Sequence, residues 1–119
     1  MKLLLDEHRT RMLANGRANA ILSEGDLNTS DFPPVVKLFN PCGGATWLLS
    51  ELDNDDPDIA FGLCDLGMGF PELGSVRISE LQSYRGPLGI GIERDEHFVA
   101  TMTLSAYAER ARVAGRIVD

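Results

Sequence analysis

Runs of apolar residues between turn-forming segments predict a series of short strands in the middle of the chain. The expected strands lie at residues 35–39, 45–52, 59–66 and 72–78. The polar segment Asp53–Asp58 is typical of a hairpin turn, and the glycine-rich segment Gly67–Pro71 is typical of a second turn. Strands joined by connections this short pair antiparallel, so the pattern predicts a meander.

Apolar positions at helical spacing predict helices at both ends of the chain. The first helix is expected from Asp6, as N-cap, through Leu13, with Asn15-Gly16 as its stop and a further turn over 17–22. A last helix is predicted from its cap at Ser105 to its end at Gly115. Its inner face is expected to hold Leu104, Ala108 and Ala111, and Tyr107 is expected to face solvent.

Between these ends, Ser79 and Gln82 have the spacing of a capping box, which predicts a short helix through Tyr84. Residues 92–98 are predicted to be extended. The predicted fold class is therefore α+β, with a small antiparallel sheet of three to five strands flanked by N- and C-terminal helices.

The length of 119 residues suits one domain over 1–119. No apolar run approaches the about 20 residues that a membrane span needs. Charged residues from Asp6 onward interrupt the leucines at the start, so no secretory signal is predicted and the expected location is the cytoplasm.

The charge is uneven along the chain. The net charge is −7, and residues 35–80 hold two basic and eight acidic side chains. Binding to nucleic acid or to an anionic membrane usually needs a basic face, so neither is predicted as a partner. An acidic middle third suits a basic protein partner, a divalent cation or solubility alone.

The acidic residues concentrate in one segment and are the predicted binding residues: Glu51, Asp53, Asp55, Asp56 and Asp58. Counted from Asp53, an EF-hand calcium loop would need a ligand, a glycine and a glutamate where the chain has Pro57, Asp58 and Cys64. No metal site is therefore predicted, and a solvated hairpin turn is the alternative to a binding surface.

Two further carboxylates, Asp65 and Glu72, flank the glycine turn and are the weak catalytic candidates. If the turn folds back they could meet and divide acid and base roles. The alternative is that Asp65 accepts hydrogen bonds from backbone amides of the turn.

Other catalytic motifs are absent. Gly67-x-Gly69 lacks the third glycine of a dinucleotide fingerprint, and Cys42, Cys64 and the two histidines have no paired spacing for zinc. No cofactor is predicted. Trp47 is expected to anchor the core or an interface, and Phe70 in the turn is either tucked under or offered to a partner as an apolar anchor.

Several segments carry a resemblance to a known family: Gly44–Leu52, Asp58–Gly67, Gly69–Gly74, Val35–Phe39 and Leu104–Ala108. Together they resemble domain of unknown function family 2958, small bacterial proteins carried by plasmids and by conjugative or integrative elements. The resemblance covers nearly the whole chain and implies a genetic setting. It assigns no catalytic residues.

Three functions follow as hypotheses. The first is an acidic protein-binding accessory factor of a mobile genetic element, with counter-defence (anti-restriction or anti-CRISPR) inhibition as its specific form and a host or element-encoded protein as its partner. The second is a small enzyme that uses Asp65 and Glu72. The third is a homodimeric structural or regulatory module that associates through an exposed sheet edge.

Overall fold

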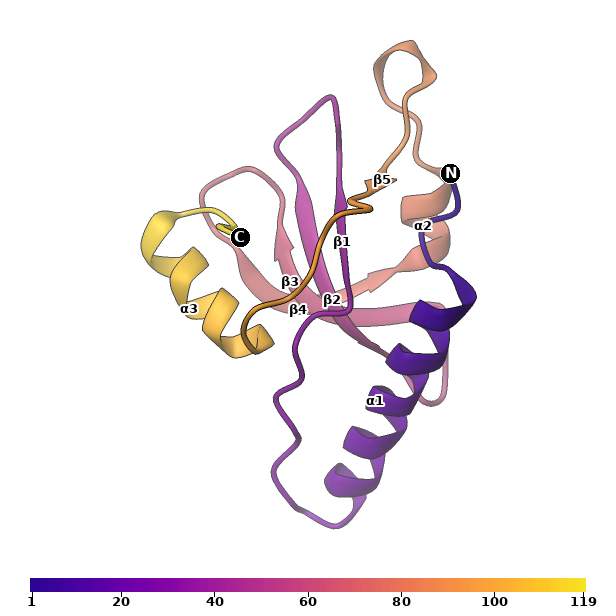
Figure 1. Cartoon of the computed structure of the whole chain (residues 1–119), viewed down its shortest axis with the longest axis vertical. Coiled ribbons are helices and arrows are strands. Elements are labelled where there is room, and N and C mark those ends of the chain that lie inside the picture. The colour runs from indigo at the N-terminus through magenta and orange to yellow at the C-terminus, as the bar shows by residue number, and fades with distance from the viewer.

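Five strands form one antiparallel sheet in the computed structural model of the protein, which describes residues 1–119 (Figure 1). The strand order is β4-β3-β2-β1-β5. The strands are β1 Val36–Phe39, β2 Thr46–Leu52, β3 Ile59–Asp65, β4 Glu72–Arg77 and β5 Glu93–Arg94. The predicted meander is confirmed as β1 to β4, and the predicted extended segment 92–98 contributes only the two residues of β5.

Three helices cover this sheet: α1 Asp6–Glu24, α2 Ile78–Ser83 and α3 Leu104–Ala114. Figure 1 shows α1 and α2 on one side of the sheet and α3 on the other. The protein is thus an α+β fold with helices at both ends of the chain, as predicted. None of the helices combines the length and the hydrophobicity that spanning a membrane requires.

The two faces of the sheet bury separate apolar cores because side chains alternate along each strand. Trp47 and Leu49 pack with Met12 of α1 and Leu81 of α2. Leu48 faces the other way and packs with α3. Each fully buried leucine contributes about 1.5–3 kcal/mol. Trp47, 6% exposed, is therefore a core anchor.

Tyr107 of α3 was predicted to face solvent, and this is wrong. Its side chain is 2% exposed and packs in the core with Leu63 and Ala111. Its hydroxyl accepts a hydrogen bond from the Thr101 amide at 3.0 Å. A buried tyrosine needs such a partner, and here the segment before α3 supplies it.

The stop predicted at Asn15-Gly16 is also wrong, because α1 continues through both residues. The Asn15 side chain donates to the Ser50 carbonyl at 2.9 Å, and Gly16 lies against the backbone of Leu52. β1 pairs with β2 only as far as Leu49, so the remaining edge of β2 is open to the helix. The glycine is present for close approach and not for termination.

The caps of all three helices differ from the predictions. Leu5 is the N-cap of α1, and its amide donates to Nδ1 of His8 at 3.0 Å. α2 begins at Ile78, and the Ser79 amide donates to Asp58 instead of joining a capping box. α3 begins after Thr103, with Ser105 inside the helix and bonded to Asp31. Gly115 ends α3 in the left-handed conformation, as predicted.

Replacing Gly16 tests the packing of α1. A Cβ at this position would lie 1.7 Å from the Leu52 carbonyl oxygen. We expect Gly16→Ala to lower the free energy of unfolding by about 3 kcal/mol, the upper part of the range for overpacked sites. Urea denaturation at constant slope measures the change.

Gly25→Ala is the matched control at the end of the same helix, where the nearest atom to a new Cβ is 3.7 Å away. It should change the free energy of unfolding by less than about 1 kcal/mol. Equal stability of the two variants would contradict the proposed role of the Gly16 contact.

Candidate functional site

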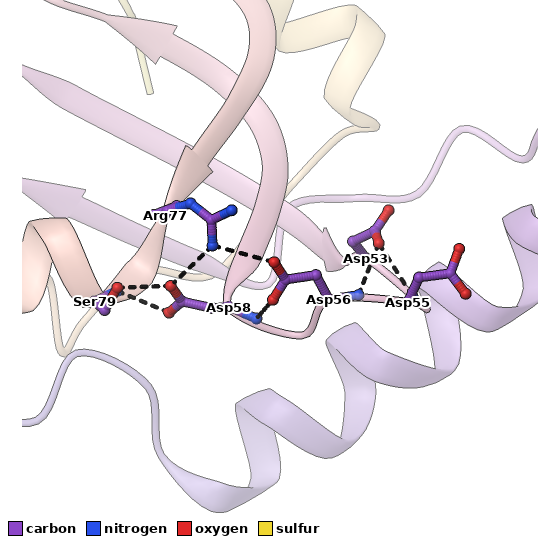
Figure 2. A network of polar contacts seen from close by, with 6 residues as sticks. All are labelled: Asp53, Asp55, Asp56, Asp58, Arg77 and Ser79. Atoms are coloured by element: carbon purple, nitrogen blue, oxygen red, sulfur yellow. Dashed lines mark hydrogen bonds and ion pairs between the residues drawn. The ribbon is translucent and has the colours of Figure 1, made fainter.

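The acidic turn, residues 53–58, joins β2 to β3 and is organised by its own carboxylates (Figure 2). Oδ2 of Asp53 accepts hydrogen bonds from the amides of Asp55 and Asp56 at 3.0 and 2.9 Å. Oδ1 of Asp56 accepts from the amide of Asp58 at 3.2 Å. These local bonds are typical of aspartate in turns, so the hairpin-turn interpretation of this segment is confirmed.

Asp56 and Asp58 also tie the turn to the junction between β4 and α2. Nη1 of Arg77 lies 3.1 Å from Oδ2 of Asp56 and 3.5 Å from Oδ2 of Asp58. Asp58 accepts from both the amide and the hydroxyl of Ser79, at 2.9 and 2.6 Å. The bonds from Ser79, with the weaker effect of Arg77, lower the pKa of Asp58. Two of the five predicted binding carboxylates are therefore tied to the junction between β4 and α2.

The other three acidic residues line an open hollow of about 350 Å³ between α1 and the turn, here called the acidic hollow. Its lining includes Glu51, Asp53 and Asp55 together with Asn19 of α1. The Asn19 side chain donates to Glu51 at 3.0 Å. Burial raises the pKa of Glu51, the bond from Asn19 opposes that shift, and the Asp53 carboxylate adds to it.

Asp65 and Glu72 do not form a carboxylate pair. Glu72 is paired with Cys64 across β3 and β4, so its side chain lies on the Trp47 face of the sheet. Asp65 is the next residue along β3 and points to the α3 face, where it is buried. It accepts from the amides of Gly67 at 2.8 Å and Ile117 at 3.0 Å. The predicted bond to the glycine turn is therefore confirmed.

The turn between β3 and β4, residues 66–71, presents large apolar side chains to solvent and is here called the apolar turn. Leu66 is 59%, Met68 70% and Phe70 83% exposed. Of the two arrangements predicted for Phe70, the structure has the exposed one. These side chains border a hollow of about 400 Å³, here called the apolar hollow, whose lining includes Trp47, Cys64 and Val76.

Two more loops lie at the same end of the sheet as the apolar turn, namely residues 40–45 and 86–92 (Figure 1). A Cβ at Gly67 would lie 3.1 Å from Gly44, so two of these loops are in contact. None of the three loops contains a charged residue. In the third loop Leu88 is 97% exposed and has a positive φ of 59°, which is rare for leucine.

The predicted binding residues therefore fall at opposite ends of the molecule. The acidic turn precedes β3 and the apolar turn follows it. Seven strand residues span about 20 Å, so Phe70 and the aspartates do not form one patch. The sequence interpretation identified Phe70 but missed Leu66 and Met68, which border the same hollow. The absence of charge across this glycine-rich turn could have indicated them.

The remaining reactive side chains do not gather into a site. Cys42 is exposed and Cys64 is half-buried, and neither forms a disulfide. Burial, with the nearby Glu72 carboxylate, raises the pKa of the Cys64 thiol and so disfavours its thiolate. No group of three or more histidine, cysteine, aspartate or glutamate side chains is arranged to hold a metal ion.

The fold and these surfaces define a small α+β protein with an acidic end and an uncharged apolar end. The chain belongs to the family described as protein of unknown function (DUF2958), whose family model matches residues 3–118. No curated protein and no solved structure matches the chain. The expected family is thus confirmed.

Glu51 offers a test of the electrostatics of the acidic hollow. Because its pKa is raised in the folded state, stability present at low pH is lost as pH rises above the ordinary value of 4.5 and the folded carboxyl loses its proton. Glu51→Gln keeps an acceptor for Asn19 and removes the charge. We expect the variant to be more stable than the wild type at pH 7 by about 0.5 kcal/mol, because the group is only half-buried. Urea denaturation at several pH values measures the difference.

Asp55→Asn is the charge-matched control, since its side chain is exposed and makes no hydrogen bond within the chain. It should change the free energy of unfolding at pH 7 by less than about 0.5 kcal/mol, as is usual for exposed surface substitutions. A Glu51→Gln variant that is less stable than the wild type at pH 7 would show that the charged form is favoured by the fold.

Proposed function

We propose that this protein is a protein-binding accessory factor of a mobile genetic element, and that Phe70 anchors its partner. The observation that carries the proposal is the exposure of Leu66, Met68 and Phe70 together at the border of the apolar hollow. Scattered exposed apolar side chains are ordinary, but a contiguous group beside a hollow marks an interaction surface. Burying such anchors in a partner is the usual source of interface energy.

The charge of the molecule supports a protein as the partner. With a net charge of −7 the chain would be repelled by nucleic acid and by anionic membranes. The three uncharged loops avoid that repulsion at the end where Phe70 lies. The acidic turn and acidic hollow at the other end supply a field that favours approach of a basic partner without contributing the anchor.

The genetic elements that carry members of this family support a more specific form of this proposal. Members of the family are similar in being carried by plasmids and integrative elements, where a small acidic protein can serve to block a host defence protein. We therefore propose counter-defence, such as anti-restriction or anti-CRISPR inhibition, as the role of the binding. The partner in that case is a host protein with an apolar pocket for Phe70 and a basic surface facing the acidic end.

A pull-down from host lysate tests the proposal with two matched variants, followed by mass-spectrometric identification. Met68→Ser with Phe70→Ser removes the apolar anchors, and Asp53→Asn with Asp55→Asn removes two charges from the acidic hollow. Loss of a central anchor costs about 2 kcal/mol or more, so the apolar variant should weaken binding of the captured protein at least about 30-fold. The acidic variant should lower capture only at low salt, because salt screens exposed charges.

Both variants replace exposed side chains and should unfold at the wild-type urea concentration, which serves as the folding control. If the apolar variant still captures the protein and the acidic variant does not, the partner binds at the acidic hollow and not at Phe70. A lysate that yields no specific protein at either salt concentration would count against a protein-binding function.

A further inference from the structure

The sheet ends at β4, whose outer side has no neighbouring strand. The Ile78 amide donates to the Asp58 carbonyl, so the hydrogen-bonded pairs of this ladder involve the even-numbered residues of β4. The backbone groups of Leu73, Ser75 and Arg77 consequently point away from β3. They form a row of N–H donors and C=O acceptors available to another strand.

Gly74 lies in the middle of this edge, and neither the backbone conformation nor the packing of the fold requires a glycine there. Its φ is not positive, and a Cβ built on it meets no atom within 4 Å. Glycine in a strand weakens it and often marks a place where another backbone approaches closely. The missing side chain therefore leaves the edge open where the outward-pointing backbone groups are concentrated.

The apolar hollow adjoins the same edge. Val76 and Glu72 of β4 line it together with Cys64 of β3 and the apolar turn. Ser75 lines both this hollow and the acidic hollow, so both hollows reach the edge. A strand added beside β4 would direct every second side chain to the face that carries the apolar hollow.

The charge along the edge indicates which side chains an added strand should carry. Glu72 is exposed and has no ion-pair or hydrogen-bond partner within the chain, whereas Arg77 is held by Asp56 and Asp58. An unpaired carboxylate beside the hollow favours a lysine or arginine on the incoming segment.

We infer that an extended segment of the partner protein adds to β4 as a sixth strand, with alternate apolar side chains in the apolar hollow and a basic side chain beside Glu72. This inference rests on the proposed function and specifies how the partner is bound. In this mode the main-chain hydrogen bonds give affinity and the hollow gives selectivity for side chains.

A second copy of the chain fits this edge less well. In the two two-fold antiparallel pairings that overlap most of β4 and use its outward groups, Leu73 would face Ser75 or Arg77 of the second copy, and Glu72 would face Val76 or Ile78. Apolar positions are then not matched with apolar ones, and Glu72 gains no cation. Each copy also carries a net charge of −7.

The probe for the test is a phage-displayed library of random linear 12-residue peptides, selected on the immobilised protein. We expect enriched peptides to alternate apolar side chains and to contain lysine or arginine. Fluorescence of Trp47, the one tryptophan, measures affinity because this residue lines the apolar hollow. Hydrogen exchange by NMR should show new protection of the Leu73, Ser75 and Arg77 amides in the complex.

Two variants separate strand addition from binding in the hollow alone. Ser75→Pro removes an outward N–H but no ladder bond, which an edge strand tolerates, and Gly74→Val fills the open space. Each should weaken the enriched peptide at least tenfold while the even-numbered amides of β4 stay protected. Met68→Ser with Phe70→Ser should abolish peptide binding in the same assay.

A peptide that needs Phe70 but binds Ser75→Pro and Gly74→Val as tightly as the wild type, without new amide protection, would overturn strand addition and leave the proposed function in place. A selection that enriches no Phe70-dependent peptide would also overturn it, and the lysate experiment would then decide the proposed function separately. Protection of the same amides on raising the protein concentration alone, with a doubled mass, would assign the edge to a second copy instead.

Discussion

The arrangement of this protein depends on the close contact between the Gly16 backbone in α1 and the Leu52 backbone in β2. Because no side chain separates them, the helix lies directly on the part of β2 that β1 leaves unpaired. The Asn15 side chain satisfies the Ser50 carbonyl there, and Asn19 reaches Glu51. A strand edge that would otherwise expose its backbone is thereby closed by a helix.

One long edge of the sheet remains open. On the side opposite β4, the sheet ends at the two residues of β5, and Arg94 of β5 donates to the carbonyls of Lys2 and Leu3 from the N-terminal segment. That segment and α1 therefore protect the β1 and β2 side. β4 has six residues and no such cover along its outer side. The fold closes its other edges and keeps this one free beside the apolar turn.

Most of the sheet could be predicted because strands and turns in a meander are encoded locally. The aspartates mark the acidic turn, and glycines mark the apolar turn. Gly16 was misassigned because a glycine in a helical pattern can end the helix or permit close approach, and only the position of Leu52 decides between them. Tyr107 and Ser79 were misassigned for a similar reason, since their partners are Thr101, Leu63 and Asp58 in other elements.

The candidate site was predictable only in part, because it depends on which loops the topology brings together. The acidic residues were correctly placed in a turn, but the sequence did not indicate that Arg77 and Ser79 engage two of them. Phe70 was identified as an anchor, whereas the contributions of residues 40–45 and 86–92 required the antiparallel order of the strands. The charge sum along the chain drew attention to the acidic residues within 35–80. It did not reveal the three short segments that are distinguished by having no charged residue.

The departures from ordinary folding rules concentrate where the proposed surface lies. Phe70 is exposed although burial of such a ring is favourable, and Gly74 weakens a strand with no packing need. The acidic end shows the opposite: its aspartates bond to amides, to Arg77 and to Ser79, and so support the fold. Local rules that are broken without compensation within the chain are expected at functional sites. This contrast supports the proposal that a partner binds at the apolar end and the β4 edge, whereas the acidic turn is first of all a structural element.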